Sequence, residues 1–196
     1  ERIKKEGKEN IWVAVGDALA LPFPDNTFDM VSGNGLFEWL GVTDKFANPT
    51  DAQLHFLKEV KRVLKPGGYV YVGIENRVGA PLFFGGIDHS GLQYTSLMPR
   101  KMADWYTKRK TGKAYQMYTY TRAGYEKHFK SAGLVDIEFF LPLPGYNLPK
   151  YVVPYHDLRA LTWLARDFLA APTLQRRILR QVISIPGVAR LWRWFF

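Results

Sequence analysis

The fold is decided by two stretches, VAVGDALALPFPDNTFDMV at residues 13–31 and LKEVKRVLKPGGYVYVGIEN at residues 57–76. At the start of the first, the run IWVAV (11–15) is continuously apolar and rich in β-branched residues, which predicts a strand covered on both faces. The loop GDALALPFPDNT follows, and residues 28–32 (FDMVS) form a second short strand. The run Gly-Asn-Gly at 33–35 ends that strand, because glycine adopts backbone angles that other residues avoid.

The second stretch continues the alternation of strands and helices. Residues 50–64 carry an apolar stripe at helical spacing, and Thr50 with Gln53 fits a capping box at the start of the helix. The turn Pro-Gly-Gly at 66–68 ends the helix, and YVYVGIE at 69–75 is again a strand. The order strand, loop, strand, helix, strand predicts parallel strands with crossover connections, hence an α/β layered sheet.

Residues 76–120 have no clear period and are rich in glycine, aromatic and polar residues, so we expect a long irregular insertion that carries function. Residues 121–132 return to a helix, capped by Thr121 and closed by Gly133, and a strand is expected at 134–141. After a proline-rich turn, helices are expected near 156–170 and 173–184.

Composition narrows the class of protein. With 196 residues, 47% of them hydrophobic, the chain can bury the core of a single domain. It has no cysteine, and its four histidines lack ligand-like spacing, so no metal site is expected. No apolar run approaches the roughly 20 residues that span a bilayer, and no signal peptide is recognisable, so the cytoplasm is the expected compartment.

The formal net charge is +9, and part of the excess is concentrated near the end of the sequence. Residues 155–196 contain seven Arg, two Asp and no Lys among many aromatic and aliphatic residues. Such a segment could face anionic lipid, nucleic acid or an acidic polymer. It could equally be a pair of helices that packs its apolar side on the core and leaves Arg in water.

The two stretches together resemble the type 11 family of class I S-adenosylmethionine-dependent methyltransferases. The first stretch is similar to one part of the family pattern, a strand followed by Gly-Asp-Ala, Leu-Pro-Phe, an acidic turn and Phe-Asp. The second stretch, with Arg-Val-Leu-Lys-Pro-Gly-Gly, is similar to a later part of the pattern. The resemblance implies a Rossmann-like sheet with S-adenosyl-L-methionine as cofactor. No glycine-rich G-x-G-x-G motif occurs near the start, so we expect an N-terminally truncated domain at 1–154, with the insertion at 76–120 as a lid, and C-terminal helices at 155–196.

The resemblance also implies a cofactor site at the ends of the first two strands. Asp17 would accept a hydrogen bond from the adenine amino group, since ligands of open α/β sheets lie beyond the carboxyl ends of strands. Ala18 would offer a backbone amide and Leu19 apolar cover. Gly33, Asn34 and Gly35 would line the methionine part of the cofactor. Alternatively, Asp17 caps its own turn and residues 33–35 only end a strand.

Candidates for the acceptor side lie after the IEN strand. Methyl transfer from a sulfonium is an in-line displacement, so the enzyme mainly orients the nucleophile and excludes water, and a base assists if the acceptor is a hydroxyl. We expect His89 to be the base. Asp88, its neighbour in the sequence, and Glu75 are the other expected catalytic residues. Alternatively, His89 is a loop residue in water. The expected substrate-binding residues are Asn76, Arg77 and Tyr94.

The expected function is therefore methyl transfer to a small-molecule, glycan or lipid-linked acceptor. The pattern YTYTRAGY with the PLPGY segment is similar to methyltransferase-like proteins of bacterial surface-polysaccharide assembly, which suggests a saccharide. Peripheral contact of the basic C-terminal segment with the inner face of a membrane would suit such a substrate. The alternatives are a non-catalytic scaffold and a nucleic-acid methyltransferase, and the second is disfavoured because no nucleic-acid-binding module is recognisable.

Overall fold

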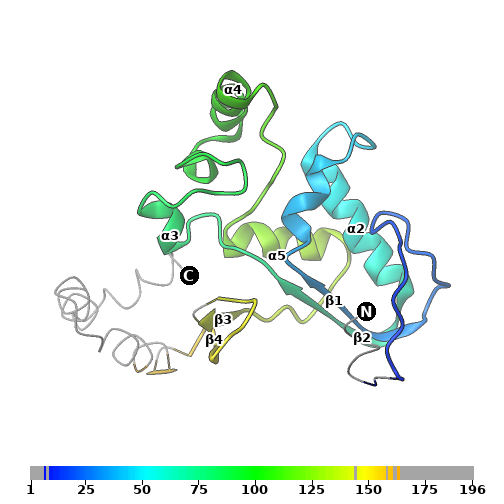
Figure 1. Ribbon diagram of the computed structural model, residues 1–196. Coiled ribbons are helices and arrows are strands. Elements are labelled where there is room, and N and C mark those ends of the chain that lie inside the picture. Colours follow the sequence, from blue (N-terminus) through cyan, green and yellow to red (C-terminus); the bar gives the residue numbers. More distant parts are fainter. Residues whose placement is uncertain (1–6, 8, 144, 158, 161–162, 164–196) are drawn as a thin grey trace.

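The computed structural model describes residues 7, 9–143, 145–157, 159–160 and 163 (Figure 1). In chain order its elements are β1 (Phe28–Asn34), the 3-10 helix η1 (Phe37–Val42), α2 (Pro49–Val63), β2 (Leu64–Gly73), α3 (Ala80–Phe83), η2 (Thr95–Leu97), α4 (Arg100–Thr111), α5 (Arg122–Ser131), β3 (Phe140–Leu143) and β4 (Tyr151–Pro154). The strands form two pairs, β1 with β2 and β3 with β4.

The β1–β2 pair is parallel, and α2 lies between its strands in the sequence. The register places Val31 opposite Val70, Gly33 opposite Val72 and Asn34 opposite Gly73. This arrangement confirms the predicted α/β order and the predicted strand at 28–32, which extends to Asn34. Because the two strands run in the same direction, their carboxyl ends lie at the same edge.

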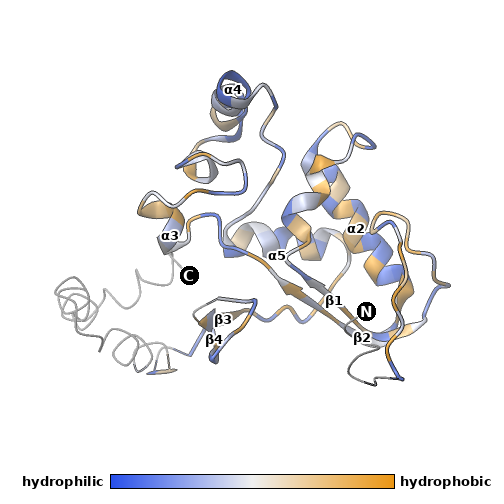
Figure 2. Ribbon diagram, in the orientation of Figure 1, coloured by the Kyte–Doolittle hydropathy of each residue, from blue (hydrophilic) through white to orange (hydrophobic). Residues whose placement is uncertain are grey.

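One face of the β1–β2 pair packs on the main core. Val31, Val70 and Val72 contact a cluster that includes Phe56 and Leu57 of α2, and Tyr125 of α5 belongs to the same cluster. The opposite face is open: Met30, Tyr69 and Tyr71 are 57%, 76% and 44% exposed. Figure 2 shows the apolar stripe of α2 and the largely hydrophilic α4.

Helix α2 begins as the sequence predicts but with a different cap. Asn48 is the N-cap and accepts a hydrogen bond from the Asp51 amide at 3.0 Å, while Pro49 occupies the first turn. The predicted capping box of Thr50 and Gln53 is therefore wrong. Gln53 is fully buried instead, and its Nε2 donates to the Phe37 carbonyl at 3.0 Å. Helix α5 has the predicted cap, Thr121.

The predicted strand at 11–15 is wrong. These residues have no regular structure, and Trp12, Val13 and Val15 are 85%, 80% and 103% exposed. An apolar run becomes a buried strand only when neighbouring strands supply hydrogen-bond partners and cover. Within the described residues β1 pairs with β2, and no strand lies beside 11–15.

The predictions for the second half of the chain are corrected in two places. The insertion at 76–120 is only partly irregular, because it contains α4. This helix has many charged residues and only two buried ones, so its apolar stripe in the sequence is weak. The strand expected at 134–141 begins at Phe140 and pairs antiparallel with β4, which lies in the stretch expected to be a turn. Nearly all of the predicted helices at 156–170 and 173–184 lie outside the described residues.

Candidate functional site

The carboxyl ends of β1 and β2 form a tight junction. Gly35 has a φ of +61° and donates its amide to the Gly73 carbonyl at 2.8 Å. A Cβ atom on Gly73 would collide with Oδ1 of Asn34, and one on Gly35 would lie 3.5 Å from the Tyr146 ring. Gly35 therefore adopts a conformation that favours glycine, and a side chain at Gly73 would displace the Asn34 amide. At this edge Asn34 presents an exposed amide side chain.

Asp17 lies in a turn with one oxygen engaged by the backbone. Its Oδ1 accepts a hydrogen bond from the Leu19 amide at 2.9 Å, and its Oδ2 pairs with the Lys45 ammonium. The hydrogen bond from Lys45 is the main cause that holds the pKa of Asp17 below its usual value. Ala18 is half-buried and Leu19 is buried. The turn capping that the sequence left as an alternative for Asp17 is thus formed, and its carboxylate remains 42% exposed.

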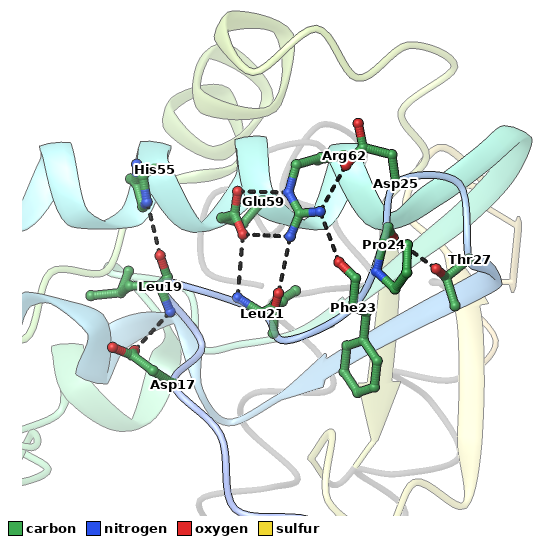
Figure 3. Close-up of polar contacts among 10 residues, drawn as sticks. All are labelled: Asp17, Leu19, Leu21, Phe23, Pro24, Asp25, Thr27, His55, Glu59 and Arg62. Carbon is green, nitrogen blue, oxygen red and sulfur yellow. Dashed lines mark hydrogen bonds and ion pairs between the residues drawn. The ribbon is translucent and has the colours of Figure 1, made fainter.

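The loop that follows Asp17 is bound to α2 by a network shown in Figure 3. Arg62 donates to the carbonyls of Leu21 at 3.0 Å and Phe23 at 2.8 Å. The same guanidinium pairs with Asp25 at 2.8 Å and Glu59 at 2.9 Å. Arg62 therefore joins the two sequence stretches that decide the fold.

Two further contacts complete this network. Glu59 accepts the Leu21 amide at 3.2 Å, and its hydrogen bond with Arg62 lowers the pKa of the Glu59 carboxyl. His55 Nε2 lies 2.9 Å from the Leu19 carbonyl oxygen. The Leu-Pro-Phe part of the motif is thus bound through its backbone groups, and the position of the Asp17 turn follows from α2.

Three acid–base side chains meet at the carboxyl edge of β1 and β2. Glu38 lies in η1, directly after β1, Glu75 lies two residues after β2, and His89 comes from the loop between α3 and η2. His89 Nε2 is 3.7 Å from Glu38 Oε1 and 3.5 Å from Glu75 Oε2. The Trp39 ring is tilted against the imidazole, with ring centroids 5.0 Å apart. The structure therefore brings together two of the predicted residues, His89 and Glu75.

Glu38 completes this group, and sequence reasoning missed it. Its side chain is 1% exposed, and neither carboxylate oxygen has a hydrogen-bond partner among the described residues. Burial raises the pKa of Glu38, and the nearby His89 opposes that effect. The available signal was position, since Glu38 follows the end of β1 much as Glu75 follows the end of β2.

Asp88, the third predicted member of the base group, faces the other way. It accepts hydrogen bonds from the Ser90 amide at 2.8 Å and from the hydroxyls of Ser90, Thr95 and, at 3.4 Å, Tyr115. Burial of Tyr115, with the Asp88 charge as the next cause, raises the pKa of that phenol. Asp88 thus shapes the loop that carries His89, through Ser90, Thr95 and Tyr115.

The predicted substrate-binding residues lie around the same loop. Arg77 donates to the carbonyls of Ser96 and Met98, and burial followed by the charge of Arg100 lowers the pKa of its guanidinium. The Asn76 side chain accepts the Val78 amide at 3.1 Å. Tyr94 is 46% exposed and has a φ of +64°. Arg77 thus anchors the η2 region, whereas Tyr94 offers an exposed aromatic surface.

No helix among the described residues is both long and apolar enough to cross a bilayer.

Comparison with known proteins concerns mainly the first part of the chain. Residues 1–72 match a family model described as a methyltransferase domain. This range contains the whole of the first decisive stretch and most of the second.

Individual relatives of the chain are named as methyltransferases. A demethylmenaquinone methyltransferase of Geobacillus stearothermophilus is 30% identical over 148 residues, which are 70% of this chain and 55% of the relative. One of Anoxybacillus flavithermus is 42% identical over 71 residues, 36% of this chain and 25% of the relative. The chain thus spans about half of the first protein and a quarter of the second.

A solved structure from Thermotoga maritima, described as an S-adenosylmethionine-dependent methyltransferase and possible histamine N-methyltransferase, has a TM-score of 0.47 and 21% identity. The alignment covers 79% of this chain and 63% of that one. The family match over both decisive stretches agrees with the α/β architecture and the parallel β1–β2 pair. In residues 1–72, the chain is therefore similar to the methyltransferase domain family that this model describes.

Proposed function

We propose that the chain takes part in methyl transfer from S-adenosyl-L-methionine to a small-molecule acceptor, with the carboxyl edge of β1 and β2 as part of the active site. The observation that carries the proposal is the family match over residues 1–72, whose two motif stretches Arg62 binds together. In open parallel sheets, the carboxyl edge is where ligands bind.

The cofactor side of the proposal consists of Asp17, Ala18 and Leu19 together with residues 33–35. Asp17 offers a partly exposed carboxylate and Asn34 an exposed amide to a nucleoside sulfonium, whereas Gly33 is buried against the Phe56 ring and Gly35 lies against the Tyr146 ring. When bound, the cofactor supplies an electrophilic methyl group. The chain's contribution is to bind and orient it.

The acceptor side consists of His89, Glu75 and the exposed ring of Tyr94. His89 is 27% exposed at its side chain, so the imidazole can reach a proton on an acceptor hydroxyl. Asp88 holds the His89 loop, and Asn76 and Arg77 hold the chain after β2. These residues orient the acceptor and receive a proton, which is the help that an in-line displacement requires.

Two observations bear on the class of the methyl acceptor, and they favour different compounds. Relatives named demethylmenaquinone methyltransferases favour demethylmenaquinone, a quinone, as the acceptor. The YTYTRAGY and PLPGY segments instead favour a glycan or lipid-linked acceptor, and the arginine-rich residues 155–196 would suit peripheral contact with an anionic membrane. Demethylmenaquinol is therefore the first acceptor to test and a lipid-linked saccharide the second.

Calorimetric titration with S-adenosylhomocysteine tests the cofactor site. Asp17→Ala should weaken binding by about tenfold or more, because a hydrogen bond to a charged group is lost. Asp29→Ala is the matched control: Asp29 is also an exposed carboxylate paired with a lysine, Lys65, but lies near the amino end of β1. Its affinity should equal that of the wild type. Equal affinity of Asp17→Ala and wild type would remove Asp17 from the site, and no binding to either would reject the proposed function for this chain.

A further inference from the structure

We propose that Glu38 is a positioning residue that holds the His89 imidazole between two carboxylates at the carboxyl edge of β1 and β2. The proposal rests on the proposed function, in which His89 receives a proton from the acceptor. It adds a residue from η1 that neither the sequence motifs nor the family match indicated.

The first argument is the burial of Glu38. A carboxylate that is 1% exposed and has no hydrogen-bond partner among the described residues destabilises the fold. A glutamine or an aliphatic side chain would fill the same space at lower cost. Groups that destabilise a fold in this way are often retained for function.

The second argument is the geometry around the imidazole. His89 Nε2 faces Glu38 Oε1 at 3.7 Å and Glu75 Oε2 at 3.5 Å, and this nitrogen too is buried without a hydrogen-bond partner among the described residues. The Trp39 ring limits the orientation of the imidazole. The distances exceed a normal hydrogen bond, and such contacts often shorten when substrate binds.

The third argument is the charge balance. Two carboxylates face one imidazole, so positive charge that forms on the ring during proton transfer has two counter-charges nearby. The phenols of Tyr125 and Tyr146 also lie near Glu38; burial is the main cause that raises their pKa, and the Glu38 charge raises it further. The group thus surrounds the imidazole with negative charge on the side of Nε2.

Together these features define the role. With Nε2 turned to the carboxylates, Nδ1 is the nitrogen left to accept a proton. With acceptor and cofactor bound, the O–H bond of a quinol acceptor would break as its proton moves to Nδ1. A ring carbon would then bond to the methyl carbon while the carbon–sulfur bond breaks and its electron pair stays on sulfur; the proton of that ring carbon would pass to solvent, and His89 would return its proton to the oxygen. Glu38 acts on this step through His89 and does not touch the acceptor.

A double-mutant cycle in thermal unfolding tests the pairing without any acceptor. Glu38→Gln should raise the Tm of the full chain at pH 8. The sign follows from the raised pKa of Glu38: its contribution to stability is fully present below the ordinary value of 4.5 and is lost as pH rises through the higher pKa of the folded state. Glutamine does not suffer this loss, so the difference from wild type should vanish toward pH 4.

The same cycle detects the partner. At pH 6, Glu38→Gln should raise Tm more in the His89→Gln background than in the wild type, because the buried carboxylate then loses the favourable electrostatic contribution of His89. Glu126→Gln, an exposed carboxylate on α5 paired with Arg122 and Lys130, is the control and should show no coupling with His89. A lower Tm of Glu38→Gln at pH 8, or additive shifts of Glu38→Gln and His89→Gln, would overturn the pairing.

A kinetic arm separates this inference from the proposed function. With demethylmenaquinol as acceptor, Glu38→Gln should lower kcat by about tenfold to a hundredfold with KM and S-adenosylhomocysteine affinity unchanged, and Glu38→Asp should restore part of the loss. Wild-type kcat in Glu38→Gln would refute the positioning role. If the wild type neither binds S-adenosylhomocysteine nor turns over, the proposed function fails, and the thermal cycle alone decides whether Glu38 holds His89.

Discussion

At the scale of single residues, Arg62 connects sequence motif and structure. The planar guanidinium donates to two backbone carbonyls and pairs with two carboxylates at once, which a lysine ammonium cannot match in geometry. Its partners Leu21 and Phe23 belong to the Leu-Pro-Phe motif. The two motifs are therefore physically complementary, because one supplies the donor and the other the acceptors.

Arg62→Lys should lower the Tm by several degrees, almost as much as Arg62→Gln, because charge alone does not replace the five-donor fork. Circular dichroism during heating measures this. Lys65→Gln is the control, since Lys65 pairs on the surface with Asp29 alone. If Arg62→Lys unfolded at the wild-type temperature, charge rather than fork geometry would hold the loop.

The candidate site was only partly predictable at this scale. His89 and Glu75 were found because a histidine in a glycine-rich loop and an acid after a strand are local signals. Glu38 was missed because FEWLG looks like an ordinary segment with an exposed acid, and its burial arises only when η1 packs on α2. The opposite orientation of Asp88 was equally invisible, since adjacent residues in a loop can face different partners.

At the scale of elements, α2 is the structural centre. It contributes buried residues to the core under β1 and β2 and carries the Arg62 network on its outer side. Sequence predicted β1, α2 and α5 because their period and caps are local properties. The prediction of a strand at 11–15 failed because a strand requires hydrogen-bonded partners. Helix α4 was not predicted because its apolar stripe is weak and its ends are set by tertiary packing.

Leu57→Ala in α2 should cost about 2–5 kcal/mol of unfolding free energy, as expected for a large-to-small change at a site with 0% exposure. Urea denaturation followed by circular dichroism measures this loss. Lys58→Ala, one position further along the same helix and exposed, should stay within about 0.5 kcal/mol of the wild type. A cost below 1 kcal/mol for Leu57→Ala would place α2 outside the cooperative core.

At the scale of the whole molecule, the β1–β2 pair has one covered and one open face. Met30, Tyr69 and Tyr71 lie on the open side, and Trp12 and Val13 add further exposed apolar surface. A large exposed apolar surface normally marks a site that binds a protein, a membrane or a ligand. The alternation along β2, with Val70 and Val72 inward and the tyrosines outward, is what the sequence pattern shows for a strand covered on one face.

The folded chain should therefore bind the dye anilinonaphthalene sulfonate under native conditions. The double variant Met30→Lys with Tyr69→Lys should lower the dye fluorescence several-fold, because it places two charges on the open face. Lys101→Glu, on the exposed side of α4, is the control and should leave the signal unchanged. Equal fluorescence of wild type and double variant would locate the dye site on another surface.

The parallel register of β1 with β2 also has a kinetic consequence. Phe28 and Leu64 begin their strands side by side, yet η1 and α2 separate them in the chain. The ladder cannot close as a local hairpin does, since the intervening helix must first bring the chain back in the same direction. The speed of refolding thus depends on how early α2 forms, and the refolding arm of a chevron plot should be slower for Leu57→Ala than for wild type.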